Sequence, residues 1–290
     1  MANNYAGRGL ARGFFLICIG IVLVAIGLSL GGKLDLGGWP FGARATWEWG
    51  DGDKVEDVGE IARDLSSETA ELVVELKAAN LVVKTGSEAA VRATDVNVST
   101  MTLEQDGDTF RVREKEWRNS IRFGKDAIRP RIEITLPDGA PLKRVKISVG
   151  AGSLELTGID AERLEIETGA GSVRGARVSA REAEIETGAG SIDFADARLH
   201  DARIRTGAGK CALSGTLTGS SSIDTGAGKV ELALNADRND YRVEYARGIG
   251  SVRIGSEEFA GVGNGSVGAV DAPNRLSIQT GIGAVTVSFR

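Results

Sequence analysis

Apolar and polar residues alternate with a period of two through most of the second half of the chain. Leu164, Ile166 and Thr168 share one parity, and the same pattern starts again at Ala183, Ile185 and Thr187. A period of two indicates β-strands that bury one face. The sequence therefore predicts a series of similar strands whose apolar side chains enter a common core.

A glycine-rich string, Gly-Ala-Gly in most copies, interrupts each alternating stretch. The first glycine of each string marks the repeat: Gly150, Gly169, Gly188, Gly207, Gly226, Gly248 and Gly281. The intervals from Gly150 to Gly226 are all equal, and the spacing then loosens. Glycine tolerates positive φ and lets neighbouring backbones approach closely, so we interpret the string as a corner between two strands.

A fixed period of about 20 residues is typical of a stacked array. We therefore predict an all-β fold, a β-solenoid built as a single-stranded, β-helix-like stack of coils of about 19 residues. Stacking aligns equivalent residues in columns about 4.8 Å apart. One column holds threonines whose hydroxyls we expect to hydrogen-bond along the stack: Thr168, Thr187, Thr206 and Thr225. Cys211 falls in a column of valine and isoleucine, so we interpret it as a small buried hydrophobe.

The glycine strings do not match nucleotide-binding loops. The stretch 169–175, GAGSVRG, has its third glycine one position late for a dinucleotide fingerprint, and no helix pattern follows. The two GAGK strings lack the earlier glycine of a P-loop and its following Ser or Thr. A nucleotide site occurs once, whereas this string recurs in phase, so the string is architectural.

Other segments predict further elements around the repeat. Leu72–Gly86 is expected to form two strands and a turn, Val98–Glu114 a hairpin around an Asp-Gly-Asp turn, and Ile132–Pro137 a strand. Val58–Ala70 is predicted to form a short helix. Gly255–Asn274 interrupts the last repeat and is expected to form a loop or partial coil that helps to close the end of the stack.

An uncharged run, Phe14–Leu30, precedes the repeat domain. With its flanking glycines it covers about 20 residues, which at about 1.5 Å per residue gives roughly 30 Å, enough to cross a bilayer core. A cleaved signal peptide is the alternative, but no A-x-A cleavage site follows the run. Arg8 and Arg12 before the span favour a cytoplasmic N-terminus and an external C-terminal domain.

We therefore divide the chain into four parts. Residues 1–12 form a cytoplasmic tail, 13–32 a transmembrane helix in the plasma membrane, 33–71 a juxtamembrane linker, and 72–290 the β-solenoid. The lipid bilayer is thus the first predicted partner, through Phe14–Leu30.

Charge and cysteine content exclude several classes of function. The formal net charge is −5, which argues against a nucleic-acid partner. Cys18 and Cys211 lie too far apart to indicate a disulfide framework or a zinc cluster. We expect no cofactor and no metal.

Charged residues occupy the outward columns of the predicted stack. Their repeat offsets align three coils into one candidate interaction surface: Glu165, Glu167, Glu184, Glu186, Arg203 and Arg205. Two glutamates one coil apart lie about 5 Å from each other, the separation found in retaining glycosidases. The neighbouring arginines instead offer ordinary ion pairs, and no aromatic residue is interleaved to hold a sugar ring. His200 has no nearby arrangement that indicates a triad, so we predict a protein without catalytic residues.

The order of the segments resembles a known family. LKAANLVVKTG is followed by LEQDGDTFRVR, then by IEITLPDGAPLKRVKISVGAGSLELTG, the TGAGS units and GVGNGSVGAV. This order, over roughly Leu72–Phe289, is similar to the bacterial "putative adhesin" family of β-strand-repeat domains, whose function is unknown. The resemblance implies a β-solenoid at a bacterial envelope, often on a membrane anchor, and it supplies no catalytic residues.

These observations favour a membrane-anchored, extracytoplasmic, non-catalytic module for binding, adhesion or scaffolding, with a role in envelope-stress response among the candidates. Its expected partner is an envelope protein or a glycan. Two alternatives stay open. One is a polysaccharide-active β-helix enzyme, and the other is a self-assembling structural subunit, because the ends of a solenoid expose unpaired strand edges.

Overall fold

The computed structural model describes residues 58–115, 130–139 and 141–290, and their strands form one sheet. The strands are β1 (Val58–Asp64), β2 (Glu71–Gly86), β3 (Ala90–Asn97), β4 (Met101–Asp106), β5 (Thr109–Glu114), β6 (Arg131–Pro137), β7 (Leu142–Thr157), β8 (Asp160–Ala176), β9 (Ser179–His200), β10 (Ala202–Thr218), β11 (Ser220–Leu234), β12 (Tyr241–Ile254), β13 (Glu257–Ala260), β14 (Gly263–Val267) and β15 (Asn274–Phe289). Within these ranges the only helix is the 3₁₀ turn η1 (Arg238–Asp240).

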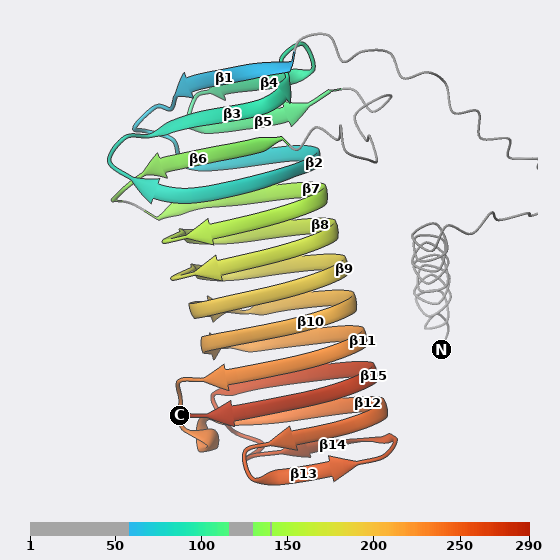
Figure 1. Cartoon of the computed structure of the whole chain (residues 1–290). Helices are drawn as coiled ribbons and strands as arrows, with labels where there is room; N and C mark the ends of the chain where they lie inside the picture. Colours follow the sequence, from blue (N-terminus) through green and yellow to red (C-terminus); the bar gives the residue numbers. More distant parts are fainter. Residues whose placement is uncertain (1–57, 116–129, 140) are drawn as a thin grey trace, which may run out of the picture. The chain divides into compact units, whose positions relative to one another are not determined.

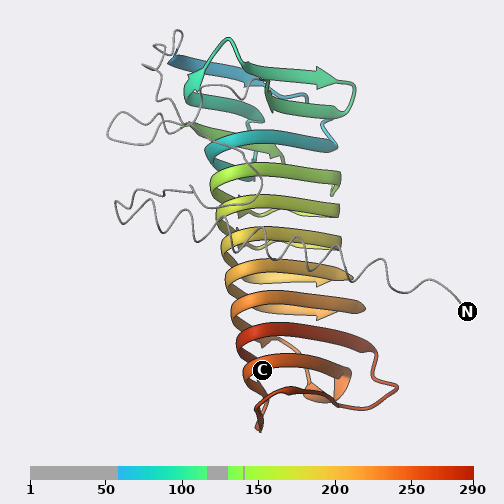
Figure 2. The ribbon, with the colours of Figure 1, turned by 90° about the vertical axis from the view of Figure 1, so that its right-hand side faces the viewer.

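The long strands wrap as coils stacked in the order β2, β7, β8, β9, β10, β11, β15, β12 (Figure 1). Neighbouring coils are parallel and in register with the sequence repeat, so that Thr168 pairs with Thr187 and Gly171 with Gly190. The view turned by 90° shows the coils lying one below another, with shorter strands at both ends (Figure 2). The predicted all-β, solenoid-like fold is confirmed.

The final coil is not last in the stack. Strand β15 lies between β11 and β12, with Ile223 paired to Ile278 on one side and Tyr245 paired to Ile278 on the other. The coils of Gly226 and Gly248 are consecutive in the sequence but not in the stack, because the C-terminal strand inserts between them.

The second glycine of each corner is more constrained than the first. Gly188, the predicted marker, has no positive φ, and a Cβ there would lie 2.6 Å from the carbonyl oxygen of Gly169. Gly190 has φ +144°, and its Cβ would overlap the carbonyl oxygen of Gly171. The corner thus depends on glycine mainly at the second position, where neighbouring coils approach most closely.

The core of the described chain is one continuous cluster of apolar side chains, which stack in columns inside the coils. Its largest fully buried side chains include Tyr241, Phe110 and Phe194. Cys211 is buried among these residues, and burial raises the pKa of its thiol to about 12. The interpretation of Cys211 as a small buried hydrophobe is therefore confirmed.

The threonine column is buried as predicted, but its hydroxyls do not bond along the stack. The threonines are at most 6% exposed, and among the described residues their Oγ1 atoms find no hydrogen-bond partner: Thr168, Thr187, Thr206, Thr225 and Thr280. The expectation of a hydrogen-bonded ladder was wrong. A buried hydroxyl without a partner is destabilising relative to a methyl group of the same shape.

We therefore expect Thr187→Val to raise the free energy of unfolding by about 0.5–1 kcal/mol. The matched control is Thr69→Val, because the Thr69 hydroxyl donates a 2.8 Å hydrogen bond to the carbonyl oxygen of Ser66 and the residue is 4% exposed. That variant should lose about 1 kcal/mol. Urea unfolding monitored by circular dichroism measures both, and a loss of stability in Thr187→Val would contradict the assignment.

Shorter strands complete the two ends of the stack. At one end, β5 and β6 pair with successive halves of β2, and β4, β3 and β1 extend them. At the other end, β13 and β14 pair antiparallel with β12. The predicted hairpin of Val98–Glu114 is confirmed as β4 and β5, and Gly255–Asn274 helps to close the end, as expected.

Two sequence predictions near the N-terminal end of the described chain were wrong. Residues Val58–Asp64 form strand β1 rather than a helix, because they pair antiparallel with β3. Leu72–Gly86 belongs to one continuous, bent strand, β2, rather than two strands and a turn. The sheet thus reaches into residues 58–71, which the sequence assigned to the linker. The predicted membrane span, 13–32, lies outside the described residues, and no helix in the described part of the chain has the length and apolar character to cross a membrane.

Candidate interaction surface

The structure brings the predicted outward residues together on one face, which we call the glutamate–arginine surface (Glu165, Glu167, Glu184, Glu186, Arg203 and Arg205). The residues belong to β8, β9 and β10, where the repeat register sets them side by side. Glu165 pairs in register with Glu184, and Glu184 with Arg203. The predicted alignment of the columns is confirmed.

Glu165 is the most enclosed carboxylate of this surface. Its side chain is 18% exposed, and its oxygens accept hydrogen bonds from Arg144 at 2.8 Å and from Arg163 at 2.6 Å. Burial alone would raise the pKa of Glu165, but the bonds from both guanidinium groups outweigh it and hold the pKa below its usual value. This carboxylate is therefore firmly ionised and held by ion pairs.

Arg205 of β10 forms ion pairs with two glutamates of β9. Its guanidinium donates to Glu184 at 3.1 Å and also to Glu186. The bond to Glu186 is the main cause that raises the pKa of Arg205. Arg203, in contrast, forms no ion pair within the described chain although it lies beside Glu184. The surface is thus partly neutralised from within.

A shallow hollow of about 250 Å³ lies on this surface between Lys146 and Glu186. Glycoside hydrolysis needs one carboxyl with a raised pKa beside one that stays ionised. Glu165, the most enclosed carboxylate of the hollow, has a lowered pKa, which is the opposite of what a general acid needs. Among the described residues, no three His, Cys, Asp or Glu side chains are arranged to hold a metal ion. The hollow offers charged and polar side chains for contact with a partner.

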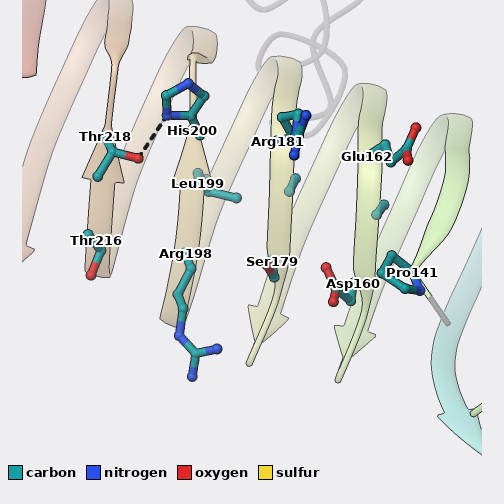
Figure 3. Close-up of a pocket in the computed structure, with 12 residues that line it drawn as sticks. Pro141, Asp160, Glu162, Ser179, Arg181, Arg198, Leu199, His200, Thr216 and Thr218 are labelled. Carbon is teal, nitrogen blue, oxygen red and sulfur yellow. Dashed lines mark hydrogen bonds between the residues drawn. The ribbon is translucent and has the colours of Figure 1, made fainter. Parts of the chain in front are cut away.

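A larger hollow, which sequence reasoning missed, lies on a different stretch of the coils. We call it the return groove; its volume is about 710 Å³ (Figure 3). Two rows of outward side chains line it. The first row is Asp160, Ser179, Arg198 and Thr216, and the second is Glu162, Arg181, His200 and Thr218.

Each row repeats at nearly the same period as the glycine corners. Register pairs connect Asp160 to Ser179, and Arg198 to Thr216. Buried residues of the same stretch, including Ala161 and Ala180, alternate with the outward ones and are also part of the groove lining. The sequence could have revealed both rows. Counting in steps of one repeat beyond the second strand of each coil would have aligned their residues.

The His200 ring nitrogen Nδ1 lies 3.0 Å from the Thr218 hydroxyl oxygen, and Nε2 lies 3.4 Å from a carboxylate oxygen of Asp201. A hydroxyl and a carboxylate thus flank the His200 ring, an arrangement that the sequence did not predict. His200 and Thr218 are both part of the polar lining of the groove.

A family model describes most of this architecture. The model for Toastrack DUF4097 matches residues 69–261, which is more than half of the chain. The chain belongs to the Toastrack DUF4097 family. The Toastrack match begins just before β2 and ends just after β13, so it covers the coils, the glutamate–arginine surface and the return groove.

Two crystal structures are similar to this Toastrack protein at low identity. One is a "putative cell adhesion protein" from Clostridium sporogenes ATCC 15579, at 12% identity and a TM-score of 0.36, covering 80% of this chain and 99% of that one. The other is a "putative adhesin" from Bacteroides fragilis NCTC 9343, at 13% identity and a TM-score of 0.38, covering 79% of this chain and 97% of that one. No curated protein matches the chain. The resemblance to the adhesin family inferred from the sequence is confirmed.

The two kinds of carboxylate on the glutamate–arginine surface should respond differently to substitution. Glu165→Gln removes the acceptor of two charge-assisted bonds in a partly buried site, so we expect a loss of about 1–2 kcal/mol near neutral pH. Glu184→Gln with Glu186→Gln affects side chains that are 40% and 41% exposed, so we expect a loss below about 1 kcal/mol.

The pH dependence gives a second readout of this prediction. Because the folded-state pKa of Glu165 is lowered, its contribution is fully present above the ordinary glutamate pKa of about 4.3 and is lost as the pH falls through the folded-state value. The stability difference between wild type and Glu165→Gln should therefore shrink in acid. Unfolding curves from pH 7 down to pH 3 measure it, and a constant difference across that range would contradict the assigned ion pairs.

Proposed function

We propose that this Toastrack protein is a non-catalytic binding module of a bacterial envelope, used for adhesion or scaffolding. The observation that carries the proposal is the rigid, in-register stack of coils, which displays rows of charged side chains at fixed spacing on two separate faces. A stack of this kind presents polar groups about 4.8 Å apart along its axis, which suits recognition of an extended protein or glycan.

We further propose that the module is anchored in the plasma membrane through residues 13–32, with residues 1–12 in the cytoplasm and the coils outside. The support is the uncharged run in the sequence and the two arginines that precede it. A role in envelope-stress response belongs to the same proposal, because an anchored external domain can report on the envelope that it contacts.

The location is tested by protease treatment of intact cells that produce the full chain. If the cell has an outer membrane, that membrane is permeabilised first. External protease should then degrade the coils. Protection of the coils in cells whose external control protein is degraded would contradict the orientation. Recovery of a soluble chain that begins near Gly32 would contradict the anchor.

The binding role is tested by crosslinking and capture from native membranes, with the full chain as bait. We expect an envelope protein or glycan to be enriched relative to a variant with Glu184→Gln, Glu186→Gln, Arg181→Ala and Arg198→Ala. The purified chain should show no turnover on a panel of envelope polysaccharides. Glycan cleavage that disappears in Glu184→Gln/Glu186→Gln would replace the binding role with an enzymatic one. If wild type and variant captured the partner equally, neither the glutamate–arginine surface nor the return groove would be the binding site.

A further inference from the structure

Two arginines of the return groove have no partner within the described chain. The guanidinium groups of Arg181 and Arg198 form no ion pair there, and the only side-chain hydrogen bond between the residues drawn in Figure 3 joins His200 and Thr218. Arg205, on the next face of the same coils, is paired to two carboxylates. Carboxylates of this chain therefore neutralise Arg205, whereas Arg181 and Arg198 are available to a ligand.

Apart from Glu162, which precedes Arg181 in its row, the groove side chains next to the two arginines can donate a hydrogen bond. Arg181 is followed in its row by His200 and Thr218, and Arg198 lies in the other row between Ser179 and Thr216. Figure 3 shows these side chains extending from successive coils in two rows. Guanidinium and hydroxyl groups in this arrangement are typical of sites that bind carboxylate or phosphate.

The other end of the groove has the opposite character. Asp160 and Glu162 occupy the two rows on β8, and both are exposed. An anion placed over these carboxylates would be repelled. The charge of the lining thus changes sign along the stack axis, which limits an anionic ligand to the end formed by Arg181, Arg198 and the coils that follow.

We propose that this end of the return groove binds anionic groups, carboxylate or phosphate, on an extended polymer that crosses the coils. The inference rests on the proposed binding function and names the ligand chemistry of one surface. Successive coils are about 4.8 Å apart, so a chain that carries charged groups every one or two coils can meet both arginines at once. The hydroxyls of the two rows supply neutral hydrogen bonds between those contacts.

The test measures binding of three probes to the purified full chain by isothermal titration calorimetry. The probes are polyphosphate, polygalacturonate and, as the uncharged control, dextran. We expect at least one anionic polymer to bind and dextran not to bind, with affinity that falls as salt increases. Arg181→Ala and Arg198→Ala should each lower the affinity about tenfold, as expected for loss of a charge-assisted contact.

Arg174→Ala is the matched control. It removes the same charge from an exposed arginine on another stretch of the coils, where Arg174 lies 3.8 Å from Glu155. This control should change the affinity less than twofold. Asp160→Asn with Glu162→Gln should raise the affinity about two- to threefold, because it removes the repelling charges without touching the arginines.

The outcomes separate this inference from the proposed function. Binding of polyphosphate alone would assign phosphate as the ligand chemistry, polygalacturonate alone would assign carboxylate, and binding of both would assign either anion. Unchanged affinity in Arg181→Ala/Arg198→Ala, or an equal loss in Arg174→Ala, would overturn the groove as the site. Absence of binding to both anionic polymers, with a partner still captured from native membranes, would overturn this inference and leave the binding module intact.

Discussion

Gly190→Ala is expected to cost about 4 kcal/mol or more of unfolding free energy, which is an exceptional loss for the addition of one methyl group. Gly190 has φ +144°, a conformation that residues with a side chain rarely adopt. Its added Cβ would also overlap the carbonyl oxygen of Gly171 on the neighbouring coil. Because that contact is with backbone, relief requires the two coils to separate and their paired strands to lose register.

Two variants of the same corner make the comparison precise. Ala189→Ser changes the partly exposed middle residue and should cost less than about 0.5 kcal/mol. Gly188→Ala should be intermediate, because its Cβ would lie 2.6 Å from a carbonyl oxygen but its φ is not positive. Chemical denaturation of the three variants gives the ranking. Equal losses in Gly188→Ala and Gly190→Ala would contradict the unequal roles assigned to the two glycines.

The first coil supplies a natural comparison for this prediction. At its corner, β2 has Lys77, Ala78 and Ala79 where later coils have Gly-Ala-Gly, and Ala79 is paired with Gly152 of β7. Strand β5 pairs with β2 only up to Glu75, and β6 pairs with β2 only from Asn80. No described strand therefore covers this corner from the other side, and alanine is accommodated. At the later corners glycine is needed for two reasons: the positive φ of the second position, which Ala79 does not share, and the close backbone of the preceding coil.

The sequence predicted the repeat well because the repeat is local and periodic. Buried parity, corner positions and the register of Glu165 with Glu184 all follow from counting along the chain in steps of one repeat. The candidate surface followed from the same count. The return groove could have been found in the same way, because its outward residues also recur at the repeat and alternate with buried ones such as Ala161 and Leu199.

The features that the sequence did not predict depend on contacts between distant segments. Strand β15 enters between β11 and β12, a choice that only tertiary pairing decides. Val58–Asp64 becomes a strand because β3 offers an edge, which overrides its local preference. Arg205 pairs with both glutamates, while Arg203 stays unpaired in the described chain. This difference depends on side-chain geometry, which the sequence alone does not give.

A second large effect is expected where a glycine and a phenylalanine share one inward column. Gly175 pairs in register with Phe194 on the next coil, and the Phe194 ring occupies the space that a side chain at Gly175 would need. The neighbours in this column are Leu156 and Leu213. Phe194 thus fills its own position and part of the space beside Gly175. Together the two residues occupy the space that two leucines would occupy in this column.

Gly175→Leu alone should therefore lower the free energy of unfolding by about 3 kcal/mol, because the buried ring has nowhere to move. Phe194→Leu alone should cost about 1–1.5 kcal/mol, through the void left beside Gly175. Each substitution removes the cause of the other's penalty. Gly175 has no positive φ, so a leucine there meets no backbone strain.

The double variant Gly175→Leu/Phe194→Leu restores the leucine column of the adjacent coils and should lie within about 1 kcal/mol of wild type. The double-mutant cycle then gives a favourable coupling of about 3–4.5 kcal/mol, measured from the unfolding free energies of the four proteins. The control pair combines Phe194→Leu with Ala189→Ser, which lies at the corner of the same coil outside this column and should give additive losses. Additive losses in the Gly175/Phe194 cycle would show that the coil relaxes around each change separately, and that the ring does not depend on the empty site beside it.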